Sequence, residues 1–229
     1  MTSTPPNIPA LARRLLHQAA DRIDADGRSG TANTYQAKLL LEVALLQRDA
    51  DCERRARCHL QRPFNPFAWC LSSLDLSQRK PVMPKQATLE DAERASPVKS
   101  TDDILAGIRR SCHNEPHLML TIDGKVDEAF ALQGSSSDLR QSEIAATVAL
   151  LGNLPRACEL TEAIGNSSYR EGPWIAIAIE AFRRGDSPML DRALDALGSD
   201  ESRSPWTSLH LALGLMGREP WVGYPYPDF

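Results

Sequence analysis

The chain has 229 residues, of which 42% are hydrophobic and 24% charged, as in an ordinary globular protein. No apolar run is long enough for a transmembrane helix and we find no secretory signal, so we expect a cytoplasmic protein without membrane association. The five cysteines are an odd, scattered set (Cys52, Cys58, Cys70, Cys112 and Cys158), which is typical of reduced thiols.

Charge is distributed unevenly along the chain. Residues 1–61 and 62–100 each carry two more Arg/Lys than Asp/Glu, whereas residues 101–229 carry eleven Arg/Lys and nineteen Asp/Glu. Binding to phosphates requires clustered cations. We therefore expect no binding to nucleic acid.

The first predicted unit, residues 1–61, is a helical hairpin unit. Apolar residues recur at helical spacing from Pro9 to Ile23, and Gly27 to Asn33 indicates the loop that follows. Leu39 and Val43 indicate a second helix, which ends at a turn at Gln47. The small residues Cys52 and Ala56 indicate a third helix after this turn.

Four arginines, Arg48, Arg54, Arg55 and Arg57, form a basic face on the last helix of this unit. A patch for RNA is one interpretation, but such patches need aromatic or broader basic support. The favoured interpretation is a solvated face whose arginines pair with Asp49, Asp51 and Glu53.

Residues 62–100 form a Pro-rich aromatic segment and linker. Prolines at this density break regular helices, and Phe64, Phe67 and Trp69 lie near the start of the segment. A short helix is indicated from Thr88, as its cap, to Ala95. Helical patterning resumes over residues 102–110, with Thr101 as the expected cap.

Residues 101–220 are predicted to form a helical repeat array. Four glycines, Gly124, Gly152, Gly185 and Gly217, recur at intervals of 28, 33 and 32 residues, and apolar residues lie eight and four positions before the last three. Glycine suits the left-handed residue that ends a helix. Asp or Pro follows three residues after each glycine (Asp127, Pro155, Pro188 and Pro220) and suits the first turn of the next helix.

This phase predicts an all-α fold, an antiparallel helical-hairpin repeat array. The expected helices span residues 140–151, 155–164, 173–184, 188–197 and 205–216. The expected core residues are Ile144, Val148, Ile177, Leu194 and Leu209, and Trp174 and Trp206 are also expected in the core.

Residues 114–217 resemble the tetratricopeptide repeat class. The resemblance rests on the turns Gly124-Lys-Val-Asp-Glu-Ala129 and Gly152-Asn-Leu-Pro-Arg-Ala157, and on Trp174 and Trp206, eleven residues before a turn glycine. The sequence differs from this class in two ways. His210 stands where a small residue is usual, and the proline that usually closes each unit is absent. The resemblance implies an α-α superhelix that binds other macromolecules.

No catalytic or cofactor motif stands out in the chain. Cys112, His113 and His117 are the closest Cys/His cluster, but a structural zinc site needs four ligands and Pro116 interrupts this segment. We therefore expect no catalytic residue, cofactor or metal.

The segment 221–229 is an aromatic C-terminal tail, with Trp221, Tyr224, Tyr226 and Phe229 among prolines. Two interpretations remain open. The aromatic side chains cap the last helices of the array, or they dock to a partner.

The expected function is that of a non-enzymatic helical-repeat protein, a scaffold or adaptor that mediates protein–protein interaction. The alternative is an enzyme or small-ligand-binding domain with a pocket between residues 62–70 and the helices. Self-association through the apolar ends of the array is a third possibility.

Overall fold

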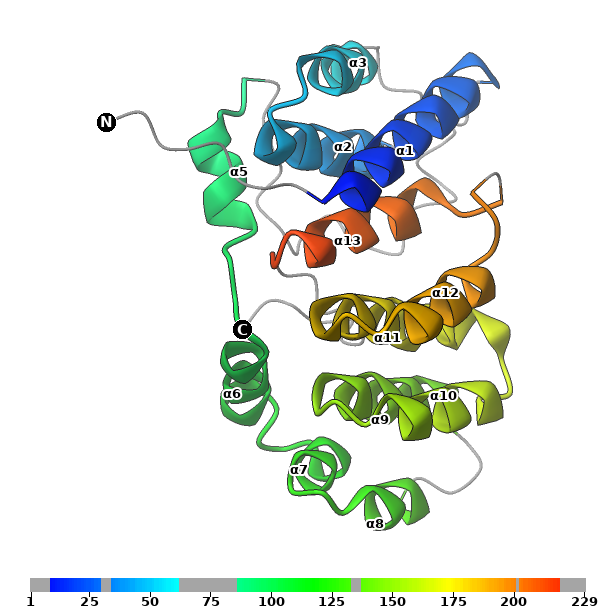
Figure 1. Ribbon diagram of the computed structural model, residues 1–229. Helices are drawn as coiled ribbons and strands as arrows, with labels where there is room; N and C mark the ends of the chain where they lie inside the picture. Colours follow the sequence, from blue (N-terminus) through cyan, green and yellow to red (C-terminus); the bar gives the residue numbers. More distant parts are fainter. Residues whose placement is uncertain (1–8, 30–33, 62–85, 133–136, 201, 219–229) are drawn as a thin grey trace. The chain divides into compact units, whose positions relative to one another are not determined.

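The structure is a computed structural model and describes residues 9–29, 34–61, 86–132, 137–200 and 202–218 (Figure 1). These residues form α-helices and one short 3-10 helix, with no strand among them, so the predicted all-α class is confirmed. The chain folds into two compact units. In the described part, the first unit holds the chain up to Pro97 together with Arg203–Arg218, and the second holds Val98–Ser202.

The first unit contains α1 (Ala10–Ser29), α2 (Thr34–Gln47), α3 (Ala50–Gln61), α5 (Leu89–Ala95) and α13 (Pro205–Leu215). Helix α1 packs along α13, α2 packs against α3, and α5 packs against α2 (Figure 1). The core is made largely of fully buried leucines, among them Leu15, Leu16, Leu40, Leu41, Leu209 and Leu211.

The second unit contains α6 (Thr101–Ser111), α7 (Pro116–Ile122), α8 (Val126–Ala131), α9 (Asp138–Leu150), α10 (Leu154–Ala163), the 3-10 helix η2 (Ser167–Tyr169), α11 (Glu171–Arg184) and α12 (Ser187–Ala196). Helix α9 packs against α7, α10 and α11, and α11 also packs against α12. Fully buried side chains of this core include Leu118, Ile144, Ile164, Ile175 and Ile177.

Five helices, α2, α7, α9, α11 and α13, end in the same backbone turn. One residue in each turn has a positive φ: Arg48 (55°), Gly124 (81°), Gly152 (85°), Gly185 (70°) and Gly217 (70°). The N–H of the next residue donates to the carbonyl five positions earlier, at N···O distances of 2.8 to 3.2 Å. This hydrogen bond defines a helix-ending motif that favours glycine, so the predicted glycine turns are confirmed.

The residue after the turn often starts the next helix. The side-chain oxygens of Asp49, Asn153 and Asp186 accept hydrogen bonds from backbone N–H groups three residues later. Pro155 and Pro188 occupy the first turns of α10 and α12, as predicted. Short connections of this kind follow directly from local sequence.

The five predicted helices are α9 to α13, displaced by one or two residues at their ends. Ile144, Val148, Ile177 and Leu209 are buried as expected. The prediction for Leu194 is wrong, because Ala193 is the buried residue of α12 and Leu194 is only half-buried. Trp174 is buried, whereas Trp206 is half-buried with its ring centroid 4.3 Å from that of His210.

Three local predictions need correction. Helix α1 does not end at a loop from Gly27 but continues to Ser29. The first turn lies at Arg48 rather than Gln47. The cap of α6 is Ser100 rather than Thr101, since Ser100 and Asp103 form a reciprocal capping box; Thr88 caps α5 as predicted.

Helix α13 follows α12 in the predicted repeat phase, but it packs against α1 and α2 of the first unit. The tail residues Trp221, Tyr224, Tyr226 and Phe229, and the segment 62–70, lie outside the described residues, so those predictions stay predictions. No described helix is both long and apolar enough to cross a membrane.

Candidate functional site

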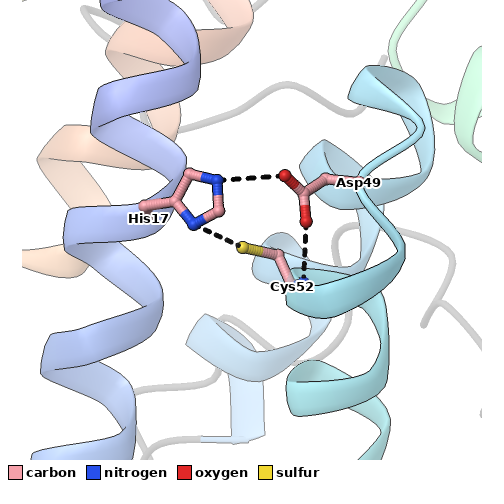
Figure 2. Close-up of side chains that lie close together, drawn as sticks. All are labelled: His17, Asp49 and Cys52. Atoms are coloured by element: carbon pink, nitrogen blue, oxygen red, sulfur yellow. Dashed lines mark hydrogen bonds and ion pairs between the residues drawn. The ribbon is translucent and has the colours of Figure 1, made fainter.

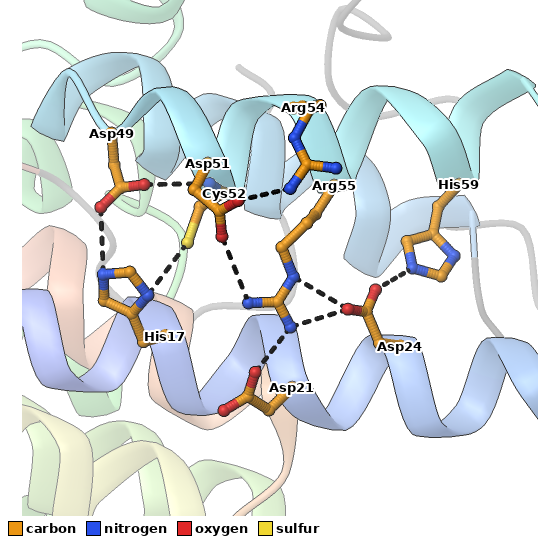
Figure 3. A network of polar contacts seen from close by, with 9 residues as sticks. All are labelled: His17, Asp21, Asp24, Asp49, Asp51, Cys52, Arg54, Arg55 and His59. Atoms are coloured by element: carbon orange, nitrogen blue, oxygen red, sulfur yellow. Dashed lines mark hydrogen bonds and ion pairs between the residues drawn. The ribbon is translucent and has the colours of Figure 1, made fainter.

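Two features of the described residues are candidates for function: a polar network between α1 and α3, and an open groove between α8 and α10. The network joins nine side chains (Figure 3). His17, Asp21 and Asp24 come from α1, Asp49 precedes α3, and Asp51, Cys52, Arg54, Arg55 and His59 come from α3.

Arg55 is the centre of the network. Its Nε donates to Asp24 Oδ2 at 2.8 Å, its Nη2 lies 2.6 Å from Asp21 Oδ1, and its Nη1 lies 3.8 Å from Asp51 Oδ2. The side chain is only 15% exposed, so these pairs are screened less than ordinary surface pairs. Arg55 thus links the C-terminal half of α1 to α3.

The carboxylate of Asp24 contacts two side chains of α3, Arg55 and His59. One oxygen accepts from Arg55, and the other lies 2.6 Å from Nε2 of His59, a side chain that is almost fully buried. Burial raises the pKa of Asp24, but the hydrogen bonds from His59 and Arg55 outweigh it, so the pKa is lowered. The carboxylate is therefore ionised and pairs with Arg55 at neutral pH.

The solvated basic face is found only in part, because Arg54 and Arg57 pair with the expected carboxylates whereas Arg55 is largely buried against α1. Arg54 contacts Asp51 at 2.5 Å, and Arg57 contacts Glu53 at 2.8 Å. Asp49, the third expected partner, contacts His17 instead.

His17, Asp49 and Cys52 form a compact cluster at one end of the network (Figure 2). His17 Nε2 lies 3.0 Å from Asp49 Oδ2, and His17 Nδ1 lies 3.5 Å from Cys52 Sγ. A carboxylate only accepts, so Nε2 of a neutral ring carries the hydrogen and Nδ1 accepts from the thiol. The other oxygen of Asp49 accepts from the backbone N–H of Cys52 at 2.9 Å.

The contacts run from Cys52 to His17 to Asp49, as in enzymes that use a cysteine nucleophile with a histidine base and a carboxylate. The thiol, however, belongs to a residue with no exposed surface. Burial and the negative charge of Asp49 raise the pKa of Cys52 to about 12, so the sulfur stays protonated at neutral pH. Burial also raises the pKa of Asp49, but the backbone hydrogen bond from Cys52 and the charge of His17 leave it lowered. A buried, protonated thiol is a poor nucleophile.

The Cys/His cluster considered from the sequence is separated in the structure. Cys112 is buried, His113 is exposed, and buried His117 places Nε2 2.7 Å from Oε2 of Glu143 on α9. Among the described residues, the group of three potential metal ligands with donor atoms within 4.8 Å of one another is His17, Asp49 and Cys52.

The groove lies on the second unit between α8 and α10 and has a volume of about 450 Å³. Phe130, Ala131, Leu160 and Ala163 supply its apolar lining, and Asp127, Arg156 and Glu159 its polar side. Arg156 lies 2.8 Å from each of the two carboxylates, both of which are largely exposed.

Comparison of the chain with protein-family models, with curated proteins and with solved structures finds no match. The groove and the network are therefore the features from which function can be inferred. Sequence reasoning missed the cluster because His17 is 35 residues from Cys52 and lies on another helix. The only local signal is the pair Asp49 and Cys52, three residues apart, which is also an ordinary helix cap.

Proposed function

We propose that the protein is a non-enzymatic scaffold or adaptor, an antiparallel helical-hairpin repeat array of the tetratricopeptide-like class that binds another protein. The observation that carries this proposal is the open groove between α8 and α10, with its apolar lining and acidic side. Repeated helical hairpins act by presenting such surfaces to partners.

The recurring turn supports the repeat. Helices α7, α9 and α11 end in the same glycine turn, and α8, α10 and α12 begin two residues after it. Each pair, α7 with α8, α9 with α10 and α11 with α12, packs together. The groove between α8 and α10 joins the second helices of two successive pairs, so it belongs to the repeated surface.

The chemistry of the groove defines the kind of partner. Phe130 and the exposed Ala131 and Ala163 offer an apolar contact. Asp127 and Glu159 leave a net negative charge after pairing with Arg156. A protein segment with an apolar side chain next to Lys or Arg complements this surface. The same acidic character disfavours nucleic acid as the partner.

Ala163 and Ala196 provide a matched test. Both are exposed alanines at the last residue of a helix, Ala163 within the groove and Ala196 outside it. Arginine is a good helix former, so neither Ala163→Arg nor Ala196→Arg should unfold the chain. The full-length parent and both variants are used as bait in extracts of the native cell, and retained proteins are quantified by mass spectrometry.

The proposal expects at least one protein to be retained by the parent and by Ala196→Arg, and to be lost with Ala163→Arg. Equal retention by the two variants contradicts a role for the groove. Retention of no protein above the level of unrelated bait contradicts the scaffold function itself.

A further inference from the structure

The cluster of His17, Asp49 and Cys52 has donor atoms suited to a metal ion, which is a property separate from the groove (Figure 2). We propose that these three side chains bind a divalent cation of the zinc class, with a water molecule in the fourth position. The site revises the expectation from the sequence that the chain holds no metal.

The spacing of the donors fits tetrahedral coordination. With metal–sulfur and metal–nitrogen bonds of about 2.3 and 2.0 Å, tetrahedral geometry places sulfur and nitrogen about 3.5 Å apart. Cys52 Sγ and His17 Nδ1 are 3.5 Å apart, and one donor atom from Asp49 lies within 4.8 Å of a donor on each of the others. A cation can therefore replace the thiol hydrogen between Sγ and Nδ1 with little rearrangement.

The capping role of Asp49 accounts for only part of its contacts. Asn153 and Asp186 occupy the same position after their turns and also cap the following helix. Capping uses a single oxygen of Asp49, and the second oxygen faces His17. On binding of the cation, this second oxygen would leave the Nε2–H of His17 and become the third ligand, while the first oxygen keeps the helix cap.

Charge around the cluster favours a cation. The nine-residue network has four carboxylates, those of Asp21, Asp24, Asp49 and Asp51, against two arginines. Arg55 pairs with three of these carboxylates, and Arg54 pairs with Asp51. A thiolate at Cys52 and the carboxylate of Asp49 would together balance a charge of +2 on the metal.

Binding requires one proton to leave. The Sγ–H bond of Cys52 breaks, its proton passes to solvent, and a sulfur–metal bond forms, while His17 contributes a neutral lone pair. The His17 side chain is 49% exposed, so solvent can supply the fourth ligand. Thiolate and imidazole donors select zinc-class ions over magnesium and calcium, which prefer oxygen.

Cobalt chloride is the probe for this site. The full-length chain, free of any affinity tag and kept reduced, is titrated with Co²⁺, and near-ultraviolet absorption is followed for thiolate-to-cobalt charge transfer. Zn²⁺ is then added to displace the cobalt. The parent should bind one Co²⁺ per chain with this absorption, and Zn²⁺ should abolish it.

The variants separate ligation from folding. Asp49→Asn keeps a side chain that caps helices well, and His17→Gln changes a half-exposed position, so both should retain the helical circular dichroism of the parent. Each should weaken Co²⁺ binding by about tenfold or more. Cys52→Ser should abolish the charge transfer, whereas Cys58→Ser, at an exposed cysteine of the same helix, should leave it unchanged.

Absence of charge transfer in the parent overturns the proposal. So does charge transfer that persists in Cys52→Ser, or Co²⁺ affinity that is unchanged in both His17→Gln and Asp49→Asn.

Discussion

Truncation of Ile177 to alanine tests the core of the second unit. Ile177 has no exposed surface and lies in α11, whose residues from Gly172 to Ala181 are all buried. The substitution removes three carbon atoms, worth about 2.4 kcal/mol at about 0.8 kcal/mol for each buried methylene. Because α11 packs against α9, α10 and α12, the surroundings cannot readily collapse into the space. A cavity adds to the cost, so we expect a loss of about 3–4 kcal/mol.

Urea denaturation followed by far-ultraviolet circular dichroism measures this loss. The control is Leu132→Ala, which truncates a leucine that is 58% exposed. The control should change the free energy of unfolding by less than about 0.5 kcal/mol. If Ile177→Ala costs no more than the control, α11 is not packed as described and the core assignment fails.

Two further substitutions test the turns and the polar network. Gly185 has a φ of 70° and open space around an added Cβ, so Gly185→Ala should cost about 1–2 kcal/mol from backbone strain alone. Gly107, inside α6 with equally open space, is the control, and Gly107→Ala should stabilise by about 0.5–1 kcal/mol in the same urea melts. The pKa of Asp24 is lowered in the folded chain, so the ionised carboxylate stabilises the fold. This stabilisation is present above the ordinary pKa of 3.8 and is lost as the pH falls below that value. Melting temperatures should show Asp24→Asn less stable than the parent at neutral pH, with the difference shrinking as the pH falls below 3.8. A constant difference would contradict the sign of that pKa shift.

The helices of the second unit could be predicted because residues at their own ends determine where each helix begins and ends. Gly152 and Gly185 permit the left-handed residue that ends a helix, and Pro155 and Pro188 suit the next first turn. Arg48 adopts the same conformation without being glycine. The turn at Arg48 was therefore placed one residue early, since composition gives no signal there.

The remaining features depend on residues distant in sequence. The contacts that join α1 to α3 link Asp24 to Arg55 and His59, which are 31 and 35 residues away. Likewise, no local pattern indicates that α13 packs against α1. The cluster around Cys52 arises only when α1 and α3 come together, so single-sequence reasoning could not find it.

Photo-crosslinking in the native cell tests the central claim, that the groove binds a protein, most directly. A benzophenone side chain introduced in place of Ala163 lies in the groove, and the same group in place of Ala196 lies outside it. Irradiation should join the chain to a second protein at position 163 and not at position 196. Absence of such a product at position 163, or the same product in equal yield at position 196, would contradict the account.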